Sequence, residues 1–201
     1  MGIPDGIVSV HANCPSGFFG KLKMDEGLGR FSDYSSIVQK LEDFEQVANK
    51  RDGKVTLAIA EPDVIIGYNI CSYPGPEERW SALGDLMYET AAVEVSRNYR
   101  GLGIAARIME WTLSEVFFES RITYMTGYSW HWDLKGTGLT GQQYRQMMIA
   151  LYSPFGFQEI HTNEPNITLL DENIMMIRIG SGVSADDHNR FKYLRFGIEH
   201  F

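Results

Sequence analysis

The chain has 201 residues, of which 18 are Lys or Arg and 26 are Asp or Glu, so its formal net charge is −8. With 44% hydrophobic and 22% charged residues, the composition is typical of a globular protein and excludes a disordered chain. The length suits one domain over residues 1–201. The acidic charge disfavours nucleic acid, no apolar run reaches the roughly 18 residues of a membrane helix, and no secretory signal begins the chain. We therefore expect a cytoplasmic protein without a nucleic-acid or membrane partner.

The first part of the sequence predicts irregular extended chain over residues 7–22, then a helix and two strands. The helix is predicted by apolar residues at helical spacing, which are Ile37, Leu41, Phe44 and Ala48. Ser32 or Asp33 can cap its start. Alternating and β-branched residues predict the two strands, at 55–59 and 64–71.

The middle of the sequence predicts a loop, a strand, a turn, a helix and a second strand. The loop at 73–81 holds two prolines and a glycine. The strand at 90–95 leads into a glycine-containing turn at 98–103. The helix after it has an apolar face made of Leu102, Ala105, Ala106, Met109, Leu113, Val116 and Phe117. A strand at 122–128 then completes a βαβ unit.

The last part of the sequence predicts two helices and two strands. Thr140 followed by Gln143 is the pattern of a capping box and predicts a helix start. Strands are predicted at 157–161 and 173–179. Ser184 followed by Asp187 predicts the start of a C-terminal helix that runs to about residue 195. Because strands and helices interleave, we expect a mixed α/β fold around one sheet.

The string Arg100-Gly101-Leu102-Gly103-Ile104-Ala105 lies where the central strand gives way to a helix. Unpaired N–H groups and the helix dipole attract an anion there, and glycine lets a phosphate approach the backbone. A Walker loop would need Gly-Lys-Ser/Thr after its second glycine, and a dinucleotide site would need three glycines near the first strand. The string has neither pattern. An ordinary tight turn remains as an alternative. The spacing of Arg100, Gly103 and Ala105 resembles the pyrophosphate motif Arg-x-x-Gly-x-Ala of GNAT acetyltransferases.

A second segment fits the same superfamily. Tyr152-Ser153-Pro154-Phe155-Gly156-Phe157 resembles its Tyr-x-x-x-Gly-Phe signature. The resemblance implies the GNAT fold, a mixed and splayed central β-sheet flanked by helices, with acetyl-CoA as co-substrate. It also implies that the backbone of residues 101–105 holds the pyrophosphate, and that the pantetheine arm pairs with the strand at Val93, Glu94 and Val95.

Other strings resemble one GNAT family, the acetoin-utilisation acetyltransferases AcuA. They are YPGPEERWS, AVEVSRNYRG, YSWHWDLKG, YRQMM and MIRIG, which together span about residues 73–196. HWDLKG is specific because it is not part of the general GNAT pattern. The resemblance implies a protein-lysine N-acetyltransferase that acetylates and inactivates AMP-forming acetyl-CoA synthetase. Two other functions remain open, a small-molecule amine N-acetyltransferase and a non-catalytic acyl-CoA-binding regulator that docks to its partner.

Acetylation of an amine needs a base, because lysine has a pKa near 10.4. Glu89 matches the position of the general-base glutamate in GNAT lysine acetyltransferases, although a solvated glutamate at the strand end is the alternative. Glu94 is the second choice and could instead pair with Arg97 or Arg100. Tyr152 matches the tyrosine that protonates the departing thiolate in many GNAT enzymes, and a merely hydrogen-bonded aromatic is its alternative.

Three aromatic side chains are candidates for acceptor contacts. His131 and Trp132 follow the second splayed strand and could wall an acyl or lysine slot, or form a rigid packing corner. Trp80 and Trp132, in loops beside charged residues, could anchor a protein partner, or pack under the sheet edge. No second histidine lies near His131, so we expect no metal. Cys14 and Cys71 are expected to be reduced, with Cys71 in the core.

Overall fold

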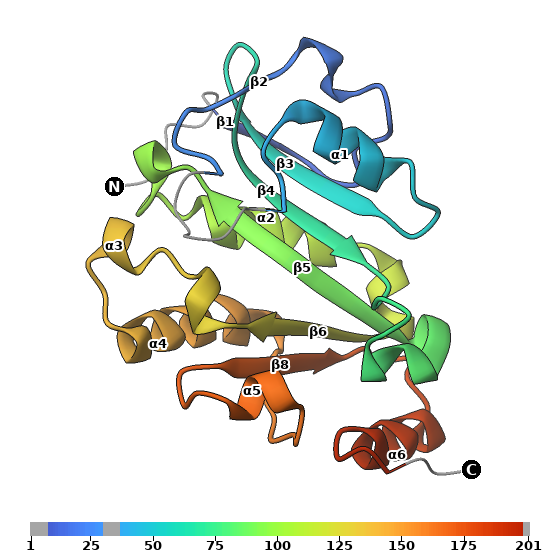
Figure 1. The fold of residues 1–201 in the computed structure, drawn as a ribbon. Coiled ribbons are helices and arrows are strands. Elements are labelled where there is room, and N and C mark those ends of the chain that lie inside the picture. Colours follow the sequence, from blue (N-terminus) through green and yellow to red (C-terminus); the bar gives the residue numbers. More distant parts are fainter. Residues whose placement is uncertain (1–7, 30–36, 199–201) are drawn as a thin grey trace.

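The computed structural model describes residues 8–29 and 37–198, so the predicted caps Ser32 and Asp33 lie outside the described residues. Within these ranges one sheet holds β1 (Val8–His11), β2 (Lys23–Met24), β3 (Lys54–Ala60), β4 (Val64–Ser72), β5 (Met87–Val95), β6 (Ile122–Gly127), β7 (Gln158–Glu159) and β8 (Ile174–Ile179). The strand order is β1-β3-β4-β5-β6-β8-β7, with β2 paired to β4 (Figure 1). The α-helices of the same ranges are α1 (Leu41–Ala48), α2 (Ile104–Leu113), α3 (Leu134–Thr137), α4 (Gly141–Tyr152), α5 (Pro165–Thr168) and α6 (Ala185–Leu194).

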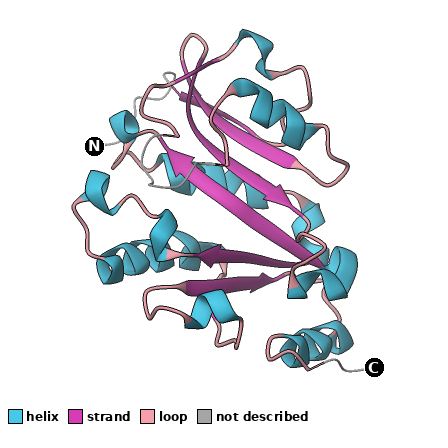
Figure 2. Ribbon diagram, viewed as in Figure 1, coloured by secondary structure: helices cyan, strands magenta, loops and turns pink. Residues whose placement is uncertain are grey.

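The two central strands, β5 and β6, are parallel and are joined through α2, which confirms the predicted βαβ unit. They pair only at their first residues, where Met87 faces Ile122 and Glu89 faces Tyr124. Beyond that point β5 runs on to Val95 and β6 to Gly127, and the two strands no longer pair with each other. The two strands separate into a V, which is plain in the ribbon (Figure 2). This is the splayed mixed sheet that the sequence predicts.

Strand β5 carries a β-bulge in the middle. Opposite β4, Ile70 pairs with Ala92 and Cys71 pairs with Thr90, so Ala91 is an extra residue. A bulge of this kind reverses which face each later side chain points to. Thr90, which bonds to Tyr152 of α4, and Val93, which packs against the cluster that contains Met109 of α2, therefore lie on the same face although they are three residues apart.

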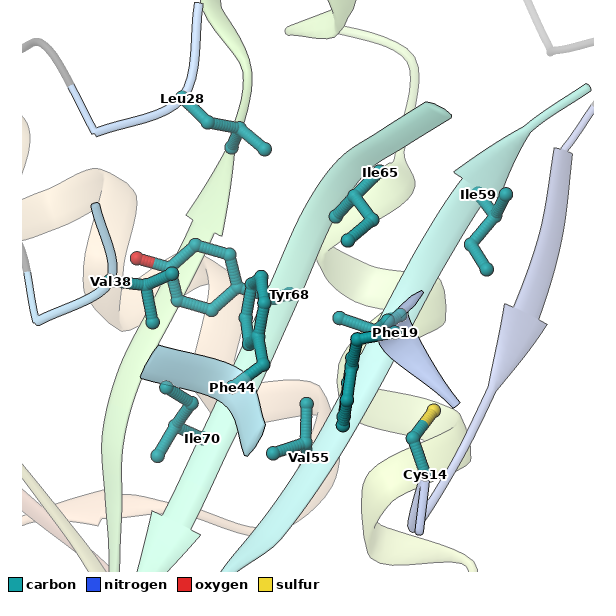
Figure 3. Close-up of a cluster of buried hydrophobic side chains, with 11 residues drawn as sticks. Cys14, Phe19, Leu28, Val38, Phe44, Val55, Ile59, Ile65, Tyr68 and Ile70 are labelled. Atoms are coloured by element: carbon teal, nitrogen blue, oxygen red, sulfur yellow. The ribbon is translucent and has the colours of Figure 1, made fainter. Parts of the chain in front are cut away.

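Helices cover both faces of the sheet. On one face α1 packs over β3 and β4, and Phe44 stacks on Phe19 with ring centres 5.6 Å apart (Figure 3). Helix α6 lies farther along the same face, where Phe191 and Leu194 pack on β6 and β8. On the opposite face α2 and α4 enclose a second apolar cluster that contains Met109. This sandwich holds the ends of β5 and β6 between two helical layers.

Several predicted elements need correction. Residues 8–11 form strand β1 rather than irregular chain. Helix α1 begins at Leu41, and Ile37 lies outside it with 55% of its surface exposed. Helix α2 ends at Leu113, which leaves Val116 83% exposed. The buried face of α2 is formed by Ile104, Ile108, Met109 and Thr112.

Two helix starts are confirmed in atomic detail. The Thr140 hydroxyl accepts a hydrogen bond from the Gln143 N–H, and the Gln143 side chain accepts one from the Thr140 N–H. The Ser184 hydroxyl likewise accepts from the Asp187 N–H. Each cap satisfies an N–H group that has no partner inside its helix.

Candidate functional site

A cavity of about 210 Å³ opens between the separated strands. Strand β5 contributes residues 90–94 and β6 contributes residues 125–127. Aromatic side chains complete its wall, which are Tyr128, His131, Trp132, Tyr144 and Tyr152. We call this space the acceptor cavity.

A second cavity of about 280 Å³ lies at the start of α2. Most of the residues predicted to hold the cofactor line it, namely Val93, Val95, Arg100, Gly101, Gly103, Ile104 and Ala105. Leu102 does not line it and instead packs against the apolar cluster of Ile104 and Ile108. We call this space the cradle cavity. The two cavities share Val93, Glu94, Tyr144 and Met148, so they meet where the strands part.

The glycine turn has the backbone geometry that its sequence predicts. Gly101 and Gly103 have φ angles of 78° and 76°, a conformation that side-chain-bearing residues rarely adopt. A Cβ built on either glycine would meet no atom within 4 Å, so open space lies before the turn. The first residues of α2 line this space, and their N–H groups have no acceptor within the helix. The turn can therefore hold an anion such as a pyrophosphate.

Arg100 is held in place by a buried carboxylate that sequence reasoning did not assign. Asp133 has no exposed surface, and it accepts hydrogen bonds from Arg100 Nη1 at 2.8 Å and from Arg97 Nη2 at 2.8 Å. It also accepts from the Gly136 N–H at 2.9 Å. Burial alone would raise the pKa of Asp133, but these hydrogen bonds outweigh it and lower the pKa. Asp133 thus ties the corner after β6 to the turn that begins the cradle.

Glu94 does not pair with either of these arginines, contrary to one of our expectations. The residue is 5% exposed, and its carboxylate accepts hydrogen bonds from the Tyr68 hydroxyl at 2.5 Å and the Gly29 N–H at 2.6 Å. These bonds connect β5 to β4 and to the N-terminal segment. The structure therefore gives Glu94 a role in holding the strand that borders both cavities.

The pKa of Glu89 is raised into the range that suits a general base near neutral pH. Burial, together with the nearby charge of Glu78, raises its pKa to about 7. Thr126 Oγ1, which borders the acceptor cavity, donates to Glu89 Oε1 at 3.4 Å. Glu78 belongs to the YPGPEERWS loop and accepts from the Tyr124 hydroxyl at 3.1 Å. Sequence reasoning missed Glu78, and its loop gave no signal beyond the family string.

Tyr152 ends helix α4 inside the protein, 1% exposed, with its ring edge-on to Phe157 at 5.1 Å. Burial raises the pKa of its phenol well above the usual range, although a hydrogen bond with Thr90 opposes the shift. The hydroxyl therefore keeps its proton at neutral pH and is available as a proton donor in the acceptor cavity.

The aromatic residues after β6 form two stacked pairs. Trp132 is 9% exposed and stacks on Tyr144 with ring centres 5.0 Å apart. Trp130 stacks on Tyr128, also at 5.0 Å, and His131 meets both of those rings edge-on. Partial burial lowers the pKa of His131, so its neutral form predominates at pH 7. Trp132 therefore walls the cavity and does not present its ring at the surface.

The structure contradicts the prediction that Trp80 anchors a protein partner. Only 2% of its surface is exposed, and its ring packs between Tyr124 and Phe191 under α6. It is a core residue and cannot anchor a partner. Both cysteines are unpaired, and Cys71 lies in the core as predicted. Cys14 is buried as well, and burial raises the pKa of both thiols.

The part of the chain that the structure describes contains neither a candidate metal site nor a helix that could span a membrane. No group of three or more His, Cys, Asp or Glu side chains there is arranged to hold a metal ion. No helix in residues 8–29 or 37–198 is long and apolar enough to cross a bilayer.

Known proteins resemble the chain in both sequence and structure, although no protein-family model matches it. The acetoin utilization protein AcuA of Bacillus subtilis is 34% identical over 152 residues, which are 75% of this chain and 71% of the relative. The crystal structure of an acetoin utilization protein from Exiguobacterium sibiricum superposes with a TM-score of 0.86 at 29% identity, covering 95% of this chain and 89% of that one. A chain of the NatC complex bound to Gag peptide and CoA shares the fold at 13% identity, with a TM-score of 0.51 and coverage of 85% and 98%. The chain therefore belongs to the AcuA family, has the GNAT fold and is an acetyl-CoA-dependent N-acetyltransferase.

Proposed function

We propose that this acetyltransferase acts in the cytoplasm on a lysine side chain of a protein, and that the protein is AMP-forming acetyl-CoA synthetase. The observation that carries the acetyl transfer is the junction of the two cavities at the splayed strands. A ligand anchored in the cradle cavity reaches the acceptor cavity by following β5 past Val93 and Glu94. The thioester then lies beside Tyr152, where an acceptor amine can approach from the open side.

The residues present fit acetyl-CoA. The N–H groups of residues 101–105 would bind its pyrophosphate, and Gly101 and Gly103 leave the space that the phosphates need. Arg100 adds a positive charge at the edge of this cavity. The edge of β5 beyond Glu89 has no β6 partner, so its backbone at Val93 and Val95 can pair with the amides of the pantetheine arm.

The proposed chemistry follows from the two titratable groups. Glu89, with a pKa of about 7, accepts a proton from the acceptor ammonium through the Thr126 hydroxyl or a water molecule. The amine nitrogen then attacks the thioester carbonyl, the new C–N bond forms, and the C–S bond breaks. Tyr152 donates its proton to the departing thiolate and takes one back from solvent. The attacking nitrogen loses one of its two protons to solvent and keeps the other as the amide N–H.

The choice of a protein lysine rests on the AcuA relationship and on the shape of the acceptor cavity. His131 and Trp132 wall the cavity, which suits the long apolar stem of a lysine. The net charge of −8 is compatible with a cationic acceptor. The identity of the partner rests on the strings HWDLKG and YPGPEERWS, which resemble the AcuA family.

The test is direct. The protein is incubated with acetyl-CoA and purified acetyl-CoA synthetase, acetyl groups are located by mass spectrometry, and the ligase activity of the synthetase is measured. We expect one lysine to be acetylated and the ligase activity to fall, with the Tyr152→Phe variant as the control for spontaneous acetylation. Efficient acetylation of a polyamine without modification of the synthetase would replace this proposal with a small-molecule acetyltransferase. Binding to the synthetase without acetyl-CoA turnover would replace it with a non-catalytic regulator.

A further inference from the structure

A third cavity, of about 350 Å³, lies between helix α6 and the sheet edge formed by β7 and β8. It shares no lining residue with the acceptor or cradle cavities. Its volume lies in the range of roughly 300–1,000 Å³ that is typical of small-molecule sites. It is therefore large enough for a ligand of its own.

The cavity has an apolar floor. Ile177 and Phe191 are buried there, and Ile160 packs partly buried against the same cluster. Ile179, at the end of β8, also lines the cavity and keeps 37% of its surface exposed. An apolar group placed in this cavity would cover surface that is now open to water.

The remaining lining is basic. His188 and Lys192 lie one turn apart on α6, and Arg195 follows at the end of the helix. No acidic residue lines the cavity. Within the described residues, none of the three basic side chains takes part in a salt bridge, although the chain as a whole carries a net charge of −8.

Two further observations describe the electrostatics of this basic group. Burial and the nearby charges of Lys192 and Arg195 lower the pKa of His188, so the basic groups act on one another. The Arg195 Nε atom is buried and has no hydrogen-bond partner in the described part of the protein. Basic groups that gather beside one another with no carboxylate among them attract an anion.

We propose that this cavity binds a small organic anion that has an apolar body. The anionic head contacts Lys192 and Arg195, and the apolar body covers Ile177, Ile179 and Phe191. A carboxylate and a phosphate monoester share this chemistry. The site is separate from the active site, so it is open while acetyl-CoA is bound.

Calorimetric titration tests the proposal, with saturating CoA present so that the cradle cavity is filled. The probes are hexanoate and phenyl phosphate, and their controls are hexanol, which lacks the charge, and acetate, which lacks the apolar body. We expect at least one of the two anions to bind at least tenfold more tightly than both controls. The better probe identifies the head as a carboxylate or a phosphate.

Variants on α6 locate the binding. Lys192→Gln should weaken the better probe at least tenfold, whereas Arg190→Gln, on the same helix but outside the cavity and paired with Asp187, should leave it unchanged. Ile179→Ser should weaken it because it removes apolar contact. Equal binding of the anions and hexanol, or equal effects of the Lys192 and Arg190 variants, would overturn the proposal.

Discussion

Replacing Asp133 by asparagine should destabilise the fold much more than replacing either arginine that binds it. Asp133 has no exposed surface, whereas the Arg97 and Arg100 side chains are 41% and 28% exposed. Asparagine keeps an oxygen that can accept from the Gly136 N–H but removes the charge that both guanidinium groups need. Breaking a buried ion pair costs roughly 3–5 kcal/mol. Because both guanidinium groups keep contact with water, we expect a loss of about 2–3 kcal/mol for this variant.

Urea unfolding measures this loss, and a protein of this size should also show a melting temperature lower by about 5–10 °C. The pKa of Asp133 is lowered in the folded state, so its stabilising effect is present above the pKa of the unfolded chain and is lost as the pH falls. The difference between wild type and Asp133→Asn should therefore shrink below about pH 4. A difference that stays constant down to pH 3, or an equal loss from Arg97→Gln, would refute the reasoning.

Three further outcomes concern the active site. Gly103→Val should weaken acetyl-CoA binding at least tenfold, about 1.4 kcal/mol, measured by calorimetry. Gly138 has the same left-handed φ and the same open surroundings, so Gly138→Val should leave acetyl-CoA affinity unchanged. Equal losses of affinity in the two variants would show that the cradle cavity does not bind acetyl-CoA. Glu89→Gln should slow transfer about 100-fold and abolish the rise of kcat/KM as the pH passes about 7; a rise that persists would exclude Glu89 as the base. Tyr152→Phe should lower kcat about 100-fold with unchanged acetyl-CoA affinity. An unchanged kcat would exclude Tyr152 as the proton donor and reduce its hydroxyl to a structural hydrogen bond with Thr90.

The elements that the sequence predicts well are those with local signals. The capping box at Thr140 and the glycine turn at Gly101 and Gly103 depend on residues within a few positions of each other, and the structure has them as predicted. Strand β1 has only four residues, and a sequence that short shows no clear alternation. The end of α2 was placed too late because Val116 continues the apolar spacing after the helix has stopped at Leu113.

The parts of the site that the sequence could not predict depend on long-range contacts. Asp133 binds Arg97 and Arg100 across 36 and 33 residues, and nothing near Asp133 in the sequence identifies those partners. Glu78 raises the pKa of Glu89 from a loop whose path is set by tertiary packing. Whether a loop tryptophan faces solvent or the core is likewise decided by its neighbours in space.

The bulge at Ala91 divides β5 into two halves, and the alternation of side chains between the two faces of the sheet reverses from one half to the other. Its first half is in register with β6, and its second half presents Val93 and Val95 to the α2 and α4 side while Glu94 turns toward Tyr68. Loss of a single residue here would turn every later side chain of the strand to the other layer. Chain length at this point is therefore under tighter constraint than the identity of any one residue. Insertions and deletions in β5 should be tolerated far less than substitutions.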